Sequence, residues 1–156
     1  MRYNLIAVFA FFWMNFSAQC DSISPLNNEI LSYVTSQLNK KVGRGECWDL
    51  ASYALNKVGA KWDGLYVYGR KLMPGECLQP GDIIQFKNVK LSYSIGKQTF
   101  TEDMKQHTAI IYSVKNADEV ILAHQNTGFS GKKVGKSPLV FSTIYKGKYS
   151  IYRPEK

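Results

Sequence analysis

The sequence predicts a single α+β domain in which N-terminal helices pack on a mostly antiparallel sheet of about five or six strands. Apolar residues first recur at helical spacing, through two segments between residues 28 and 58. From residue 65 the pattern changes to short runs rich in β-branched and aromatic residues. Hairpin-length turns separate these runs, with no helical segment between them, and this order favours antiparallel pairing.

The first twenty residues predict a signal peptide. Arg2 precedes an apolar run at residues 5–14, which is too short to span a bilayer and has the length of a signal-peptide core. The expected boundaries are residues 1–20 for the signal peptide and residues 21–156 for the domain. A cleaved signal peptide implies a secreted or periplasmic location.

The first predicted helix is capped by Asn27 or Asn28. Ile30, Val34 and Leu38 would form its apolar face. The glycine-containing segment that follows ends this helix.

The second predicted helix extends from Cys47 to Val58 and ends at Gly59, a common C-terminal residue. Its apolar positions fall on one face, so Cys47 is expected on the inward side of the first turn. Gly43 and Gly45 give the preceding loop backbone freedom.

Six later runs have strand character. They are residues 65–69, 82–86, 107–114, 118–126, 139–145 and 149–154. Residues 88–106 are long for a loop and are expected to form an extra hairpin around Gly96.

The two histidines of the chain occupy positions that pairing of neighbouring strands would bring together. His107 begins one predicted strand, and His124 lies near the end of the next. Side chains alternate along a strand, so His124 and Asn126 share a face while Gln125 points the other way. An antiparallel hairpin would therefore gather His107, His124 and Asn126 at one end of the sheet.

Cys47 is the candidate nucleophile. A thiol at a helix N-terminus benefits from the helix dipole, and a neighbouring imidazolium lowers its pKa further. His107 would act as the base, and either His124 or Asn126 could orient its ring. The backbone N–H of Cys47 could stabilise an oxyanion.

Two alternatives for these residues remain open at the level of sequence. After cleavage at Cys20, export would allow Cys47 and Cys77 to form a disulfide. A zinc site of Cys47, His107 and His124 has the ligand number of a catalytic metal but lacks closely spaced ligand pairs. Neither a metal nor a cofactor is expected.

The net charge of +8 favours an anionic partner such as a wall polymer or a membrane surface. The lysines are spread along the chain, and no nucleic-acid-binding motif accompanies them. No nucleic-acid partner is therefore expected.

Several segments together resemble the CHAP domains, which are cysteine- and histidine-dependent amidohydrolases/peptidases related to the NlpC-type proteins of the papain-like group. The segments are "GRGECWDLASYAL", "CLQPGDIIQF", "HTAII" and a strand ending in "HQN". The resemblance covers about residues 28–153 and implies a papain-like fold. It also implies Cys47 as nucleophile and His107 as general base. The third position, acidic in CHAP domains, holds His124 here, as is usual in NlpC-type relatives, and Asn126 follows two positions later.

The resemblance implies an exported amidase or endopeptidase that hydrolyses amide bonds of peptidoglycan or another amide-containing wall polymer. A monomer is expected, and an immunity or inhibitor protein is a possible partner. The alternative is a non-catalytic binding module of the same fold for a cell wall or a membrane surface. In that case Cys47 would be inert or disulfide-bonded to Cys77.

Overall fold

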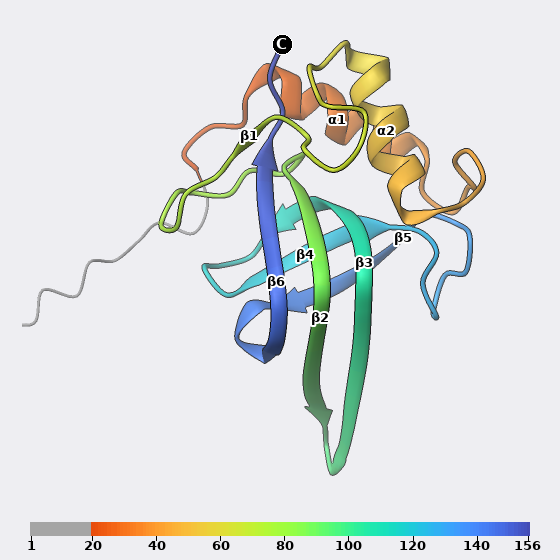
Figure 1. The fold of residues 1–156 in the computed structure, drawn as a ribbon, viewed down its shortest axis with the longest axis vertical. Coiled ribbons are helices and arrows are strands. Elements are labelled where there is room, and N and C mark those ends of the chain that lie inside the picture. The colour runs from red at the N-terminus through yellow and green to blue at the C-terminus, as the bar shows by residue number, and fades with distance from the viewer. Residues whose placement is uncertain (1–19) are drawn as a thin grey trace, which may run out of the picture.

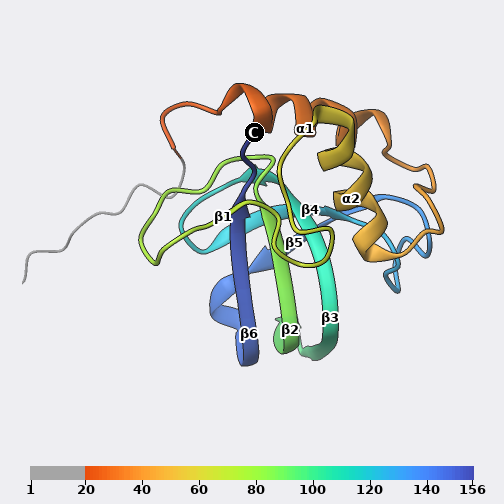
Figure 2. The ribbon, with the colours of Figure 1, turned by 45° about the horizontal axis from the view of Figure 1, so that its top comes forward.

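The computed structural model describes residues 20–156 and confirms the predicted α+β class. Two helices lie together at one end of a six-stranded antiparallel sheet (Figures 1 and 2). All but the last residue of the predicted signal peptide falls outside the described residues. Within residues 20–156, no helix is long and apolar enough to cross a membrane.

Helix α1, Pro25–Ser36, begins three residues earlier than the sequence predicted. Its N-cap is Ser24, whose hydroxyl accepts a hydrogen bond from the Asn27 N–H. The prediction that Asn27 or Asn28 caps this helix is therefore wrong. Asn27 lies within the helix and is completely buried, with its amide bonded to other segments.

Helix α2, Cys47–Val58, has the predicted bounds, and Gly59 ends it in the left-handed conformation with φ 68°. Its N-cap residue is Glu46. The loop before it is compact because Gly45, with φ 85°, packs directly under Lys132. A Cβ atom at residue 45 would lie 2.7 Å from the Cβ atom of Lys132, so this loop requires glycine there.

The sheet has the strand order β1-β6-β2-β3-β4-β5, and all its neighbours are antiparallel. Its strands are β1 Arg70–Lys71, β2 Ile83–Ile95, β3 Gln98–Val114, β4 Glu119–His124, β5 Gly135–Val140 and β6 Ile144–Arg153. In both ribbon views β4 and β5 cross behind the other strands, so the sheet curls on itself (Figures 1 and 2).

Strands β2 and β3 form a long hairpin that projects away from the helices (Figure 1). Their pairing continues to Ile95 and Gln98, and the turn contains Gly96 with φ 61°. The predicted hairpin around Gly96 is confirmed, although it extends the two strands and does not form a separate element.

The predicted strands at 82–86, 118–126 and 149–154 are present with different ends, and two other predicted strands differ more strongly. Residues 65–69 form a loop, because the Asp63 carboxylate accepts hydrogen bonds from the N–H groups of Leu65 and Val67 and closes a turn. The run predicted at 139–145 is divided by a short 3-10 helix, Phe141–Thr143. That helix forms because Asp118 binds the backbone of the same segment.

Two apolar cores lie on opposite faces of the sheet. The first packs α1 and α2 on the sheet and includes Ile30, Val34, Leu50, Leu55, Ile83 and Ile110. The second fills the inside of the curl and includes Ile84, Phe86, Ala109, Ile111, Val120 and Leu122. His107 borders this inner core, with its ring centroid 6.2 Å from that of Phe86.

Asp82 of the "PGD" turn is the centre of a buried polar network. Its carboxylate, completely buried, accepts a two-point hydrogen bond from the Arg153 guanidinium at 2.8 and 3.1 Å. It also accepts hydrogen bonds from the side chain of Asn27 and the N–H of Gln79. The network joins α1, the start of β2 and the end of β6, which confirms a structural role for Asp82.

Cys77 forms a disulfide with Cys20. The predicted alternative of a Cys47–Cys77 disulfide is therefore wrong, and Cys47 is the free thiol of the described residues. The disulfide also makes Cys20 part of the folded domain.

Candidate active site

Cys47, at the first position of α2, opens into a cavity of about 680 Å³. One wall is formed by residues 102–107 of β3 and the other by residues 126–129 after β4. His107, His124 and Ser137 line the same cavity. The long β2–β3 hairpin and the loop after β4 therefore both contribute to the cavity.

The two histidines form a hydrogen-bonded line with a serine. The Nε2 atom of His107 lies 2.8 Å from the Nδ1 atom of His124. The Nε2 atom of His124 lies 2.8 Å from the Oγ atom of Ser137. His124 is thus held on both sides, while no residue of the described chain hydrogen-bonds the Nδ1 atom of His107.

The strand register explains this line. Ile110 pairs with Ala123, so His107 and His124 are diagonal neighbours on the inner face of the curled sheet. On the other side of β4, Leu122 pairs with Ser137 of β5, which again makes Ser137 a diagonal neighbour of His124.

Asn126 does not contact His107. By simple extension of the register it would lie opposite His107, but its φ of 62° turns the chain out of the strand. Its side chain is exposed and donates a hydrogen bond from Nδ2 to the Glu46 carboxylate at 2.7 Å. Of the two candidates for orienting His107, the structure therefore places only His124 against its ring.

Burial lowers the pKa of both histidines, since each is less than one-tenth exposed. The pKa of His107 falls to about 4 and that of His124 to about 3, the latter also because of its neighbour His107. Burial also raises the pKa of the Cys47 thiol, although hydrogen bonds from backbone groups, first that of Thr108, oppose this effect. Both pKa shifts favour a thiol and neutral imidazoles in this cavity, whereas the sequence led us to expect a thiolate–imidazolium pair.

One arrangement of protons leaves the Nδ1 atom of His107, which has no hydrogen-bond partner among the described residues, able to accept a proton. Its Nε2–H must donate to His124 Nδ1, so that its own Nδ1 atom is unprotonated. His124 then carries its proton on Nε2 and donates to Ser137. Ser137 is compatible with this tautomer, because its hydroxyl can accept that hydrogen bond as well as donate one.

Asp49, in the first turn of α2, is buried, with only 2% of its surface exposed. Its carboxylate accepts hydrogen bonds from the N–H groups of Arg44 and Glu46 and pairs with the Arg44 guanidinium. These contacts lower the pKa of Asp49 against the effect of its burial. Asp49 thus holds the loop before Cys47.

Phe129 covers one side of His124, with ring centroids 5.5 Å apart. A Cβ atom at residue 135 would lie 2.6 Å from the Phe129 ring, so Gly135 makes room for it. Phe129 is itself 58% exposed and forms part of the cavity wall.

Sequence reasoning missed Ser137, Gln125 and Phe129. Ser137 could not be predicted from the sequence, because its contact with His124 depends on the pairing of β4 with β5. The predicted strand in this region began at residue 139 and did not include Ser137. Gln125 could have been noted as a polar residue on the helix-facing side of a buried strand. Phe129 follows a Thr-Gly pair in a loop, where an apolar residue is a recognisable sign of a surface contact.

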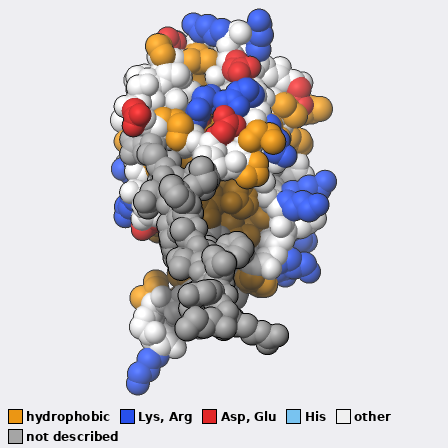
Figure 3. All heavy atoms as spheres, turned by 90° about the vertical axis from the view of Figure 1, so that its left-hand side faces the viewer, with side chains coloured by type: hydrophobic (Ala, Val, Ile, Leu, Met, Phe, Trp, Pro, Cys, Tyr) orange, Lys and Arg blue, Asp and Glu red, His pale blue; other side chains and the backbone are white. Residues whose placement is uncertain are grey.

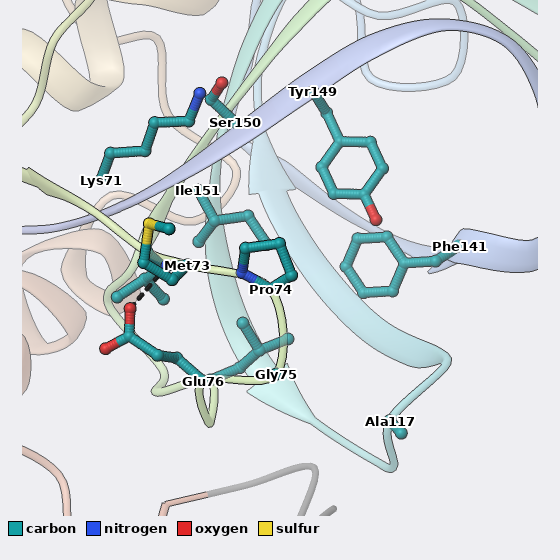
Figure 4. A pocket seen from close by; sticks show the side chains of 12 residues that line it. Lys71, Met73, Pro74, Gly75, Glu76, Ala117, Phe141, Tyr149, Ser150 and Ile151 are labelled. Carbon is teal, nitrogen blue, oxygen red and sulfur yellow. Dashed lines mark hydrogen bonds between the residues drawn. The ribbon is translucent and has the colours of Figure 1, made fainter.

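A second cavity, of about 630 Å³, lies far from these residues, at the end of β1 and beside the disulfide loop (Figure 4). Met73, Pro74 and Ile151 face it, and Tyr149 stacks on Phe141 at its edge. It contains neither a thiol nor a histidine. The space-filling view of this side shows lysine and arginine side chains dispersed among acidic ones, with no single basic patch (Figure 3).

No group of three or more His, Cys, Asp or Glu side chains among residues 20–156 is arranged to hold a metal ion. Cys47 lines the same cavity as the two hydrogen-bonded histidines.

A family model for the AIM3/BBC1 cysteine proteinase-fold domain matches residues 24–156. The chain belongs to this family. A curated relative, altered inheritance of mitochondria protein 3 of Debaryomyces hansenii, is 27% identical over 146 residues. The match covers 80% of this chain but only 15% of that protein, so the chain corresponds to a small part of its relative.

Two solved structures have a similar fold. The crystal structure of Ly7917 superposes with a TM-score of 0.52 at 21% identity, covering 81% of this chain and 62% of that one. Ly7917 with the hydrolyzing product of MDP gives a TM-score of 0.51 at 19% identity, covering 82% of this chain and 62% of that one. Together with the family match, these two structures establish the cysteine proteinase fold. This agrees with the papain-like fold that the resemblance to CHAP domains implied.

Proposed function

We propose that this domain is a cysteine hydrolase that cleaves amide bonds through nucleophilic attack by the Cys47 sulfur. The observation that carries the proposal is the line His107–His124–Ser137 in the same cavity as the free thiol. A merely structural pair of histidines would not need one unpartnered ring nitrogen at a cavity that also holds a thiol.

In the first half of the reaction, the neutral His107 takes the thiol proton at Nδ1 while the sulfur bonds to the carbonyl carbon. The carbonyl oxygen becomes an oxyanion, for which the N–H of Cys47 at the start of α2 is a suitable donor. When the intermediate collapses, the C–N bond breaks and His107 gives its proton to the leaving amine. The acyl group remains on Cys47 as a thioester.

In the second half, His107 takes a proton from water as the water oxygen attacks the thioester carbon. The C–S bond breaks, the sulfur recovers a proton from His107, and the carboxylic acid leaves. The buried, neutral state of the site suits this general-base route, because an unprotonated imidazole is available throughout the neutral range.

The substrate class that we propose is the peptide part of peptidoglycan, cut between sugar and peptide or within the peptide. Two observations support it: the resemblance of the motifs to CHAP domains, and the similar fold of Ly7917, whose structure was determined with the hydrolyzing product of MDP. The cavity is lined along an extended segment, residues 102–107 of β3, beside which a peptide could lie.

We also propose that the domain acts after export. The Cys20–Cys77 disulfide is typical of proteins that fold in an oxidising compartment. Cleavage after Gln19, one residue before the boundary predicted from the sequence, would keep Cys20 in the mature protein.

Digestion of purified peptidoglycan by the wild type and by the Cys47→Ser variant tests the proposal. The wild type should release fragments with new amine and carboxyl ends, and mass analysis of these fragments would identify the bond. The Cys47→Ser variant should be slower by at least about 1,000-fold, because serine is a far weaker nucleophile without a stronger base. Equal release by both proteins would exclude Cys47 as the nucleophile, and binding without release by the wild type would favour the non-catalytic module.

A further inference from the structure

The segment His124–Asn126 contacts both halves of the candidate site. The His124 ring lies on the inner face of the sheet against His107. Gln125 points to the opposite face, where α2 and the loop before Cys47 lie. At the end of β4, His124 thus contacts the proposed base His107, and the adjacent Gln125 contacts the backbone that leads into Cys47.

The Gln125 amide is completely buried and makes three hydrogen bonds to that loop. Its Oε1 atom accepts from the Val42 N–H at 3.1 Å. Its Nε2 atom donates to the Val42 carbonyl at 2.9 Å and to the Glu46 carbonyl at 2.8 Å. The set also fixes the amide orientation, since the flipped group would place an oxygen against two carbonyls.

The Glu46 carbonyl belongs to the residue that immediately precedes Cys47 and caps α2. A side chain that holds this carbonyl fixes where α2 begins and therefore where the sulfur lies. Only a side chain with one acceptor and two donors in a plane can make all three bonds. Glutamate would present no hydrogen to either carbonyl, and an apolar side chain would leave three buried backbone groups without partners.

We infer that Gln125 is a positioning residue that holds the Cys47 sulfur in register with His107 by clamping the backbone of Val42 and Glu46. The inference rests on the proposed function, in that a catalytic rate is one of its readouts. His124, on the other face of the same strand, hydrogen-bonds the ring of His107. A shift of the end of β4 would therefore move the His107 ring and the backbone before Cys47 together.

The first test compares Gln125→Met, which keeps the length of the side chain without its polar atoms, with the wild type on a peptidoglycan fragment. We expect kcat to fall by about 100-fold with KM within about threefold, because a displacement of the sulfur by about 1 Å is enough for such a loss. Gln79→Met is the matched control. Gln79 is also a buried glutamine that bonds a backbone N–H, that of Ser24, but lies away from the site. The Gln79→Met variant should have a lower melting temperature than the wild type and a kcat within about twofold of the wild-type value.

Gln125→Asn provides a milder variant in case the methionine variant does not fold. Its amide is one methylene shorter and can reach only one of the two carbonyls, so kcat should fall by about 10-fold. A folded Gln125→Met or Gln125→Asn protein with the wild-type kcat would overturn the inference.

Alkylation of Cys47 in the disulfide-intact protein supplies a readout that needs no substrate. In Gln125→Met the sulfur should become more exposed, and the midpoint of its alkylation rate against pH should move down toward that of an ordinary thiol. An alkylation profile identical to that of the wild type would overturn the positioning role. A wild type without hydrolase activity, but with this shift in Gln125→Met, would reject the proposed function and keep the positioning role.

Discussion

Two buried polar networks hold this domain together, and they differ in whether every polar atom is used. At the Asp82 network, both carboxylate oxygens accept two hydrogen bonds each, and the buried charge is matched by Arg153. At the histidine network, the line from Ser137 to His107 ends at a ring nitrogen with no protein partner and beside a cavity. The Asp82 carboxylate therefore has no free acceptor position for a ligand, whereas the Nδ1 atom of His107 is left without a protein partner and can accept a proton.

The difference also appears in charge. Asp82 and Arg153 are a charged pair whose mutual contact compensates their burial. The histidine network is neutral, because burial lowers both histidine pKa values far below 7. The Asp82 network, in which the charges are paired and every carboxylate oxygen is hydrogen-bonded, is suited to stabilise the fold. The histidine network, which is neutral and has one ring nitrogen without a partner, is suited to transfer a proton.

The largest effect is expected from breaking the saturated network with Asp82→Asn. The substitution leaves Arg153, whose side chain is 15% exposed, without its counter-charge, and should lower the free energy of unfolding by about 3–5 kcal/mol. Urea unfolding measures this loss, and kcat of the protein that remains folded should be unchanged. Glu119→Gln, which breaks the more exposed Lys115–Glu119 pair, is the control and should cost less than about 1 kcal/mol. A cost below about 1 kcal/mol for Asp82→Asn would contradict a structural role for this network.

A second prediction separates the two candidates for orienting His107. His124→Phe should reduce kcat by about 100-fold, because it removes the acceptor for the His107 Nε2–H and with it the selected tautomer. Asn126→Ala should reduce kcat by less than about fivefold, since its amide contacts Glu46 and not His107. Melting temperatures of both variants show whether either loss comes from unfolding. The reverse order of the two effects would assign the orienting role to Asn126.

The elements that could be predicted from the sequence are those with a strong local pattern. Helix α2 and its end at Gly59 follow from helical spacing and one left-handed residue, and the hairpin around Gly96 follows from two strand-like runs. The contact of His107 with His124 followed from their places at the start and end of paired strands. These inferences succeeded because they need only neighbouring segments of the chain.

The features that could not be predicted depend on contacts across the fold. The sequence could not show that Cys77 pairs with Cys20, because pairing depends on where the chain start returns. It could not show that Asn126 leaves the strand, because a single residue with φ 62° decides this. The burial of the thiol and the imidazole, which shifts their pKa values away from an ion pair, could not be predicted either, because burial is set by tertiary packing.

The central claim is that Cys47 rests as a thiol beside a neutral His107 and is activated only during attack. The rate of Cys47 alkylation by iodoacetamide, measured from pH 5 to pH 10 on the disulfide-intact protein, tests it most directly. Because burial raises the thiol pKa, the thiolate fraction at neutral pH should be small. The account predicts a slow rate near pH 7 and a single rise above the pH at which an ordinary thiol ionises. A fast rate that stays constant down to pH 5 would reveal a preformed thiolate–imidazolium pair and would contradict the account.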